Sequence, residues 1–132
     1  MDDLKLVELA VLARENSYSP YSGFKVGAAL LSGSGKVFAG CNIENSAYSS
    51  TVCAERTAFF KAVSEGERSF EAIAVAGWSD CIEKAFPCGV CRQVMAEFCK
   101  DDFRVLVVES GGDYREFSLG ELLPHSFKLG GM

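Results

Sequence analysis

Apolar residues recur at helical spacing in three stretches of the chain. Asp2 or Asp3 can cap the first predicted helix, because a short acidic side chain accepts a hydrogen bond from the first free amides. Thr51 is the expected cap of the second helix, and Gly66 is its expected end. The predicted helices cover residues 3–16, 51–65 and 88–100, and their expected packing residues include Leu4, Val7, Val11, Leu12, Val94, Met95 and Phe98.

Shorter apolar runs between these helices predict strands. Two of them flank the turn-forming segment 32–35 and predict a β-hairpin. Two others, rich in Val, Ile and Ala, predict strands buried on both faces. We expect residues 78–87 to form a loop and residues 119–123 a single helical turn. The predicted strands cover residues 24–31, 36–41, 70–77, 103–109 and 114–118.

This alternation of strands and helices predicts a layered α/β fold, with helices covering a five-stranded mixed sheet. The chain has 132 residues, enough for one substantial core. It contains no linker, repeat or low-complexity run. We therefore expect a single domain over residues 1–132.

Composition narrows the choice of partners and compartment. A formal net charge of −5 argues against a polyanion as the main partner, although a local basic patch stays possible. The first residues, Met1, Asp2 and Asp3, do not begin a secretory signal, and no apolar run approaches the roughly 20 residues that span a bilayer. We expect a cytoplasmic protein, in which the six cysteines are metal candidates rather than a disulfide framework.

Three cysteines have the spacing of metal ligands. Cys88 and Cys91 are three positions apart, so one helical turn places them on a shared face. Cys53 lies near the start of another predicted helix, and helix N-termini favour thiolate over thiol. Three protein ligands leave the fourth position of a tetrahedral zinc ion open for water. The sequence therefore predicts an open zinc site.

Glu55 and Arg56 follow the first of these cysteines directly. Cys53 and Glu55 are two positions apart and would point to nearly opposite sides of a regular helix. Both can reach one metal only if Cys53 lies at the edge of the helix. Zinc with three thiolates carries net negative charge, and Arg56 can hydrogen-bond the thiolates and return positive charge to the site.

Each feature taken alone has a simpler interpretation. A single Cys-x-x-Cys motif can be a redox motif or a coincidence, and a helical glutamate is usually a solvated surface residue. The combination of Cys-x-Glu with a later Pro-Cys-x-x-Cys favours catalytic zinc. A closed structural site would need a fourth ligand. The candidates, none of which has partner spacing, are Cys41, Cys81, Cys99 and His125.

At these motifs the sequence resembles the cytidine deaminases of the short, homotetrameric, zinc-dependent type. The resemblance implies a three-layer α-β-α sandwich, one Zn²⁺ per subunit held by the three cysteines, and Glu55 as proton shuttle. Segment 78–86 has no counterpart in the family pattern. The matching segments are residues 18–30, 40–45, 51–58, 87–93 and 121–124, followed by Phe127.

The resemblance also implies contacts with a nucleoside. Asn42 and Glu44 are expected to hydrogen-bond the ribose 3′-hydroxyl, because an amide and a carboxylate together supply a donor and an acceptor. Phe24 resembles the aromatic residue that contacts the base, and Ala54 is a further expected substrate contact. From the residues alone, the preferred interpretation is that Asn42 and Asn45 form turns, and a phenylalanine in a strand, such as Phe24, is more often plain core.

Two aromatic residues and a second arginine complete the implied site. Tyr48 resembles a contact between subunits, and Phe127 resembles the C-terminal aromatic that closes the site of a neighbouring subunit. Arg92 is expected beside Arg56 near the metal. If these assignments hold, the active site is shared within a homotetramer.

The implied reaction is the hydrolytic deamination of cytidine and 2′-deoxycytidine to uridine and 2′-deoxyuridine with release of ammonia, a step of pyrimidine salvage. Zinc-bound water would attack C4 while Glu55 moves its proton to N3. A deaminase of antibiotic-type nucleosides or of polynucleotides is an alternative, and a non-catalytic zinc module is an alternative of another class. The acidic charge and the contact with a free 3′-hydroxyl favour a nucleoside over a nucleic acid, and no membrane partner is expected.

Overall fold

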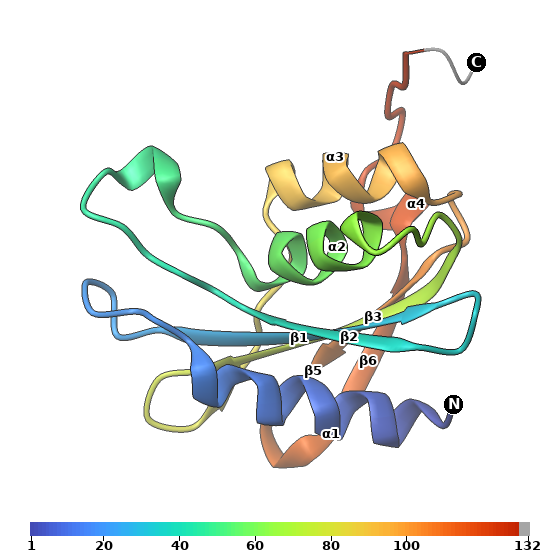
Figure 1. Ribbon diagram of the computed structural model, residues 1–132. Helices are drawn as coiled ribbons and strands as arrows, with labels where there is room; N and C mark the ends of the chain where they lie inside the picture. The colour runs from blue at the N-terminus through green and yellow to red at the C-terminus, as the bar shows by residue number, and fades with distance from the viewer. Residues whose placement is uncertain (130–132) are drawn as a thin grey trace.

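The computed structural model, which describes residues 1–129, consists of a β-sheet with helices on both faces (Figure 1). The helix α1 covers one face, and α2, α3 and α4 cover the other, which confirms the three-layer prediction. None of the helices in this described part has the length and apolar composition needed to cross a membrane. The helices are α1 (Asp3–Ala13), α2 (Ala54–Ser64), α3 (Gly89–Phe98) and α4 (Leu119–Leu122), with short 3₁₀ turns η1 (Arg14–Asn16), η2 (Tyr48–Ser50) and η3 (Ser110–Gly112).

The sheet is mixed and has six strands, in the order β2-β1-β3-β5-β6 with β4 paired to β3. Only the β3–β5 pair is parallel among the described strands. The expected count of five strands was wrong because β4 lies inside the predicted loop 78–87. A strand of two residues is too short to show any periodicity. The strands are β1 (Lys25–Ser32), β2 (Val37–Cys41), β3 (Phe70–Trp78), β4 (Ile82–Glu83), β5 (Arg104–Val108) and β6 (Tyr114–Ser118).

Two cores pack on the two faces of the sheet. Along β1, Ala28 and Leu30 belong to the core beneath α2 and α3, whereas Ala29 and Leu31 belong to the core beneath α1. This alternation follows from the two-residue period of a strand. β3 and β5 are buried along most of their length, as expected for the parallel centre of a layered sheet.

The buried side of α1 differs from the predicted stripe. Asp2 caps the helix as expected, accepting a hydrogen bond from the Leu4 amide at 3.1 Å. Val7 is buried as predicted, but Leu4 and Leu12 are 56% and 58% exposed, and Leu6 and Ala10 are buried in their place. The helix can approach closely at Ala10 because Gly27 lies opposite. A Cβ atom on Gly27 would lie 2.1 Å from the Ala10 carbonyl oxygen.

The start of α2 also differs from the prediction, because Cys53 and not Thr51 is its N-cap. Val52 exchanges backbone hydrogen bonds with Ile43 at 3.0 Å in both directions, so the chain is still extended at this point. The Thr51 hydroxyl instead accepts from the Asn45 amide at 3.2 Å. The helix therefore begins two residues later than the cap preference alone suggests.

The first turn of α2 rests directly on the backbone of β2. A Cβ atom on Gly40 would lie 2.5 Å from the Ala54 carbonyl oxygen and 2.6 Å from the Ala58 nitrogen, too close for any side chain. The absence of a side chain at Gly40 thus sets the depth at which α2 sits on the sheet.

Candidate metal centre and adjoining pocket

Three cysteine sulfurs meet where α2 and α3 begin. Cys53 and Cys88 are the N-caps of the two helices, and Cys91 lies in the first turn of α3. Their sulfurs all lie within 4.8 Å of one another, and those of Cys53 and Cys88 are 3.5 Å apart. Within residues 1–129 no other cluster of metal-ligating side chains forms. The four other candidates for a fourth ligand, Cys41, Cys81, Cys99 and His125, lie outside this cluster.

The conformation of Cys53 explains how Cys53 and Glu55, two positions apart, can face the same site. Its φ of −78° and ψ of 157° are extended, so its side chain is not bound by helical geometry. Glu55 is inside the helix and only 3% exposed, and both residues line the same cavity. The requirement that Cys53 lie at the helix edge is therefore met.

The charge state of the sulfurs favours a cation between them. Hydrogen bonds from Cys91 and from the Arg56 guanidinium lower the pKa of Cys53 to about 5. The pKa of Cys91 is raised, because its thiol donates to Cys53 and is buried beside other negative groups. Three such close sulfurs cannot all ionise without a cation between them. A zinc ion would satisfy this donor set, because zinc prefers sulfur ligands in tetrahedral geometry.

The two arginines near the metal ligands act differently. Nη2 of Arg56 donates to the Cys53 sulfur at 3.5 Å, as the sequence predicts, and hydrogen bonding to Cys53 raises the pKa of this guanidinium further. Arg92 instead donates from Nε to the Pro87 carbonyl and from Nη1 to the Leu122 carbonyl, both at 2.7 Å. Arg92 thus holds the backbone just before Cys88, and its side-chain hydrogen bonds within the described residues go to carbonyl oxygens and not to sulfur.

Burial gives Glu55 the protonation behaviour of a general acid and base. Desolvation, with a smaller contribution from the charge of Cys53, raises the pKa of this carboxyl to about 7. A carboxyl group with a pKa near neutrality can both accept and donate a proton at ordinary pH.

A cavity of about 460 Å³ extends from the sulfurs and holds most of the predicted substrate contacts. The lining of this cavity comprises Ser22, Phe24, Val26, Asn42, Glu44, Thr51, Val52, Cys53, Ala54, Glu55, Lys84, Ala85, Phe86 and Cys88.

A larger hollow of about 680 Å³ lies between the end of α3 and the start of β5, away from the three clustered cysteines. Its acidic residues Glu71 and Asp102 are exposed.

Tyr48 and Phe127 do not line this cavity of their own chain. Tyr48 is 80% exposed, and its ring packs edge-on against Tyr21 at 6.5 Å between centroids. The ring of Phe127 is also exposed, and its carbonyl accepts a hydrogen bond from the Gln93 amide at 3.1 Å. Both aromatic residues are therefore available to another molecule rather than to this pocket.

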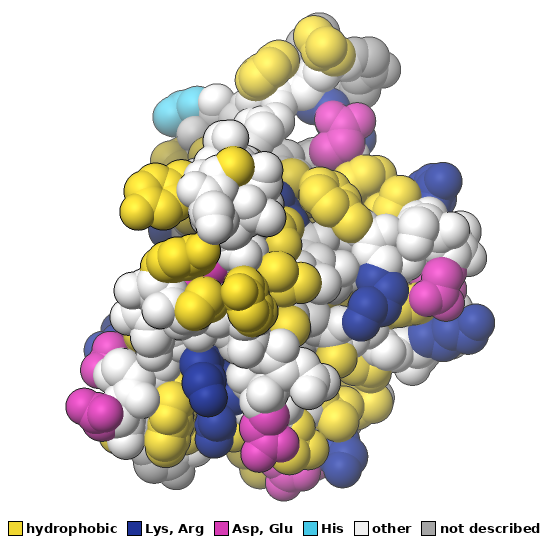
Figure 2. All heavy atoms as spheres, turned by 60° about the vertical axis from the view of Figure 1, so that its left-hand side comes forward, with side chains coloured by type: hydrophobic (Ala, Val, Ile, Leu, Met, Phe, Trp, Pro, Cys, Tyr) yellow, Lys and Arg dark blue, Asp and Glu magenta, His cyan; other side chains and the backbone are white. Residues whose placement is uncertain are grey.

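The prediction missed part of the cavity wall. Lys84, Ala85 and Phe86 line it because β4 turns the chain back beside β3. Ser22 also lines it, and the only available signal was that Ser22 lies inside the matching segment 18–30. Figure 2 shows the face that carries these loops and the starts of α2 and α3, with hydrophobic side chains gathered in its middle and charged ones mostly around them.

Comparison with known proteins agrees with this geometry. Residues 1–107 match the family model "Cytidine and deoxycytidylate deaminase zinc-binding region". The chain is 54% identical over 127 residues to a cytidine deaminase of Sporosarcina psychrophila, covering 96% of this chain and 92% of that one. A cytidine deaminase of Halalkalibacterium halodurans is 52% identical over 96% of this chain and 95% of its own length.

A solved structure extends the match to the fold. The crystal structure of cytidine deaminase from Burkholderia pseudomallei superposes with a TM-score of 0.89 at 50% identity, covering 96% of this chain and all of that one. The fold, the cysteine cluster and these matches place this chain in the cytidine deaminase family, whose members are hydrolytic enzymes.

Proposed function

We propose that this protein hydrolyses cytidine and 2′-deoxycytidine to uridine and 2′-deoxyuridine with release of ammonia, as a step of pyrimidine salvage in the cytoplasm. The observation that carries the proposal is the buried Glu55 carboxyl in a cavity that also contains Cys53 and Cys88. We assign the activity to one domain over residues 1–132, of which residues 130–132 lie outside the described part.

The mechanism depends on the proton exchange of Glu55. Cys53, Cys88 and Cys91 would hold one zinc ion per subunit, and this ion would supply Lewis-acid activation of water. Glu55 takes a proton from the attacking water and delivers it to N3 of the pyrimidine, which makes C4 more electrophilic. After the water oxygen has bonded to C4, Glu55 passes the second proton to the amino group, and ammonia leaves.

Other pocket residues orient the nucleoside. Phe24 would pack against the base, with Ala54 beside it at the start of α2. Asn42 and Glu44 would bind the sugar 3′-hydroxyl as donor and acceptor. The negative charge of a 3′-phosphate would be repelled by the Glu44 carboxylate. The pocket therefore favours a free nucleoside over a nucleic-acid chain.

We further propose that the active enzyme is a homotetramer with shared sites. Tyr48 and Phe127 are exposed aromatic residues that lie outside the cavity of their own chain. We propose that they contact the nucleoside pocket of a neighbouring subunit, which an isolated chain would leave open on that side.

The loss of cytidine absorbance in the ultraviolet tests the function directly. We expect the zinc-loaded protein to convert cytidine, and Glu55→Gln to lower kcat by roughly 10² to 10⁴ because the proton shuttle is lost. Zinc content should stay unchanged in this variant, since Glu55 is not a ligand. Glu65→Gln, which changes an exposed glutamate at the far end of α2, is the matched control.

Two outcomes contradict the proposal. A wild-type protein that binds zinc but leaves cytidine intact would instead be a non-catalytic zinc module or a deaminase of another substrate. Near-normal turnover by Glu55→Gln would remove the assigned role of this residue.

A further inference from the structure

The segment 17–23 lies beside residues 42–44 and forms part of the same wall. The Tyr18 amide donates to the Asn42 carbonyl at 3.1 Å, and the Glu44 amide donates to the Tyr18 carbonyl at 2.8 Å. These two hydrogen bonds form a short parallel bridge between segments that lie far apart in the sequence. Side chains of the first segment can therefore orient Asn42 and Glu44.

The side-chain amide of Asn42 is held in one orientation. Its Oδ1 accepts from the Val26 amide at 2.9 Å and from the Ser17 hydroxyl at 2.5 Å. Its Nδ2 donates to the Phe24 carbonyl at 2.9 Å. Because a backbone amide must donate and a carbonyl must accept, the amide cannot be flipped. Among residues 1–129, the second N–H of Nδ2 has no partner and can donate to a ligand.

The carboxylate of Glu44 is held by the same segment. Its Oε1 accepts from the amides of Tyr21 and Ser22 at 2.9 and 3.2 Å, and its Oε2 accepts from the Ser22 hydroxyl at 2.5 Å. The Ser22 hydroxyl lowers the pKa of this carboxyl, followed by the backbone amides of Ser22 and Tyr21, so the group stays ionised and accepts only. Within the described part of the chain these three bonds leave lone pairs of the carboxylate unused.

Ser22 also connects Glu44 to the aromatic residue of the pocket. Its hydroxyl oxygen accepts from the Phe24 amide at 3.0 Å while its proton goes to Glu44. Ser17 and Ser22 thus bond the side chains of Asn42 and Glu44 and the backbone of Phe24.

We propose that Ser17 and Ser22 are positioning residues that set this pocket to recognise a free secondary hydroxyl group, the sugar 3′-hydroxyl. The free N–H of Asn42 donates to the hydroxyl oxygen, and Glu44 accepts the hydroxyl proton. Ser17 and Ser22 keep the donor and the acceptor pointing into the cavity. This inference rests on the proposed function, since it names how that same site reads the sugar.

Ser22→Ala tests the inference through two substrates. With cytidine, we expect KM to rise roughly tenfold, because one of three hydrogen bonds that aim the carboxylate is lost, while kcat stays within about twofold. With 3′-deoxycytidine, which lacks the hydroxyl, we expect the same substitution to change kcat/KM less than about twofold.

Two further variants separate positioning from damage to the fold. Ser22→Thr keeps a hydroxyl and should restore the KM for cytidine. Ser34→Ala removes a comparable exposed serine that bonds the Glu67 carboxylate at 3.1 Å in the distant hairpin, and it should leave both substrates unchanged.

Each contrary outcome has a distinct meaning. An equal loss with cytidine and 3′-deoxycytidine, or no change in Ser22→Ala, overturns the positioning role while leaving the deaminase activity in place. A wild-type protein that uses both nucleosides equally well overturns recognition of the 3′-hydroxyl. A wild-type protein that deaminates neither nucleoside overturns the proposed function, and this inference with it.

Discussion

Arg56 is the residue on which the charge balance of the metal centre depends. Three thiolates and a dication leave the centre negative, and Nη2 of Arg56 contacts the Cys53 sulfur at 3.5 Å. Its Nε is buried and has no hydrogen-bond partner among the described residues, so the guanidinium is held in place by the sulfurs rather than by a carboxylate. Side chains that contact metal ligands in this way commonly tune metal affinity.

Replacing Arg56 with alanine should weaken zinc binding. We expect Arg56→Ala to lower zinc affinity about 10- to 100-fold, because the thiolates lose their compensating positive charge. Competition with a coloured chelator measures the affinity without any activity assay. Arg68→Ala is the control, since the side chain of Arg68 bonds only the carbonyls of Val63 and Glu67 among the residues that the structure describes. Unchanged affinity in Arg56→Ala would contradict this role.

At the scale of elements, two glycines set how deeply the helices sit on the sheet. Gly40 on β2 faces the first turn of α2, which carries Glu55, the proposed acid–base residue, and follows Cys53, a proposed zinc ligand. Gly27 on β1 faces the backbone of Ala10 and Arg14, near the end of α1 on the opposite side. The same substitution at the two positions therefore displaces different helices.

Gly40→Ala should impair catalysis, whereas Gly27→Ala should only destabilise the fold. Each added methyl group forces a backbone shift, which we expect to cost about 1–3 kcal/mol of unfolding free energy. A displaced α2 should also lower kcat at least about tenfold and alter the absorption spectrum of bound Co²⁺. Urea unfolding, kcat and this spectrum distinguish the two variants. Equal kcat in both would show that the depth of α2 does not matter.

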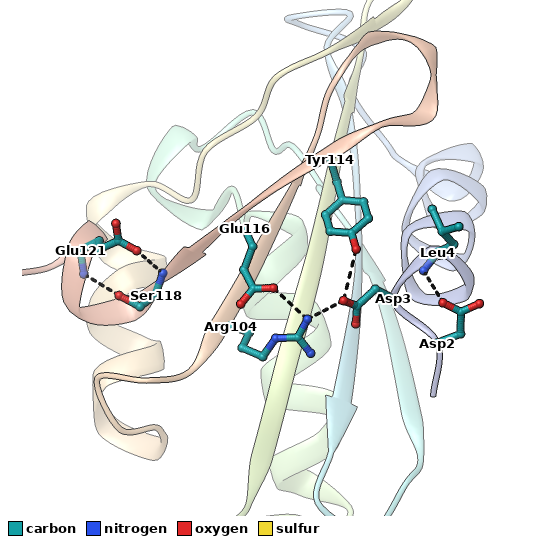
Figure 3. A network of polar contacts seen from close by, with 8 residues as sticks. All are labelled: Asp2, Asp3, Leu4, Arg104, Tyr114, Glu116, Ser118 and Glu121. Carbon is teal, nitrogen blue, oxygen red and sulfur yellow. Dashed lines mark hydrogen bonds and ion pairs between the residues drawn. The ribbon is translucent and has the colours of Figure 1, made fainter.

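The attachment of α1 to the sheet edge includes an ion pair. Figure 3 shows Arg104 of β5 between Asp3 at the start of α1 and Glu116 of β6. Nη2 of Arg104 lies 2.5 Å from Asp3 and 2.8 Å from Glu116, and the Tyr114 hydroxyl donates to Asp3 at 3.2 Å. The hydrogen bond from Arg104 is the main reason that the pKa of Asp3 lies below its ordinary value of 3.8.

Asp3→Asn should reduce stability near neutral pH but much less in acid. A lowered folded pKa contributes stability above the ordinary value of 3.8, and this contribution is lost as pH falls through the folded pKa. We expect Asp3→Asn to lower the free energy of unfolding by about 1 kcal/mol at pH 7, a small loss because solvent screens the ion pair. The loss should shrink below pH 3.8. Urea unfolding at pH 7 and at a pH below 3.8 measures both values.

A matched control for Asp3→Asn lies on the same helix. Glu8→Gln breaks an exposed pair with Lys5 at 3.7 Å and should change stability little at either pH. A loss in Asp3→Asn that is the same at both pH values would assign it to something other than the ionised carboxylate.

For the whole molecule, the exposed apolar residues support the proposed association of subunits. Hydrophobic side chains gather on the face of the molecule that Figure 2 shows. This face carries the loops before β1 and after β2 and the starts of α2 and α3. Contiguous apolar surface of this kind marks interaction sites. The exposed large apolar residues in the loops before β1 and after β2, on α2 and α3, and in the C-terminal segment are Tyr18, Tyr21, Ile43, Tyr48, Phe60, Val90, Phe127 and Leu129.

Mixing two inactive variants tests whether sites are shared. Phe127→Ala should lose most activity if Phe127 closes the pocket of a neighbour, and Glu55→Gln should lose it through chemistry. In mixed oligomers, an intact Glu55 site can receive Phe127 from the other variant, so activity should recover. Light scattering should give the mass of a tetramer. A monomer in solution, or no recovery after mixing and reassembly, would contradict shared sites.

The local chemistry of this chain could be predicted from its sequence, because it depends on neighbours along the chain. Cys88 and Cys91 share one helical turn, Cys53 and Glu55 flank a helix start, and periodicity located the main helices and strands. The expected position of Arg56 beside Cys53 also follows from spacing within one turn. These features involve contacts between residues at most four positions apart, which local geometry determines.

Only the tertiary structure decided which distant segments meet. The extension of the chain through Val52, which moved the start of α2, comes from pairing with Ile43, and the buried side of α1 is decided by close approach to Gly27. The strand β4, the cavity wall that it brings, and the hold of Ser17 and Ser22 on Asn42 and Glu44 likewise depend on long-range packing. Sequence patterns record the period of each element but not its partner, so the ligands were predictable while the arrangement that aims them was not.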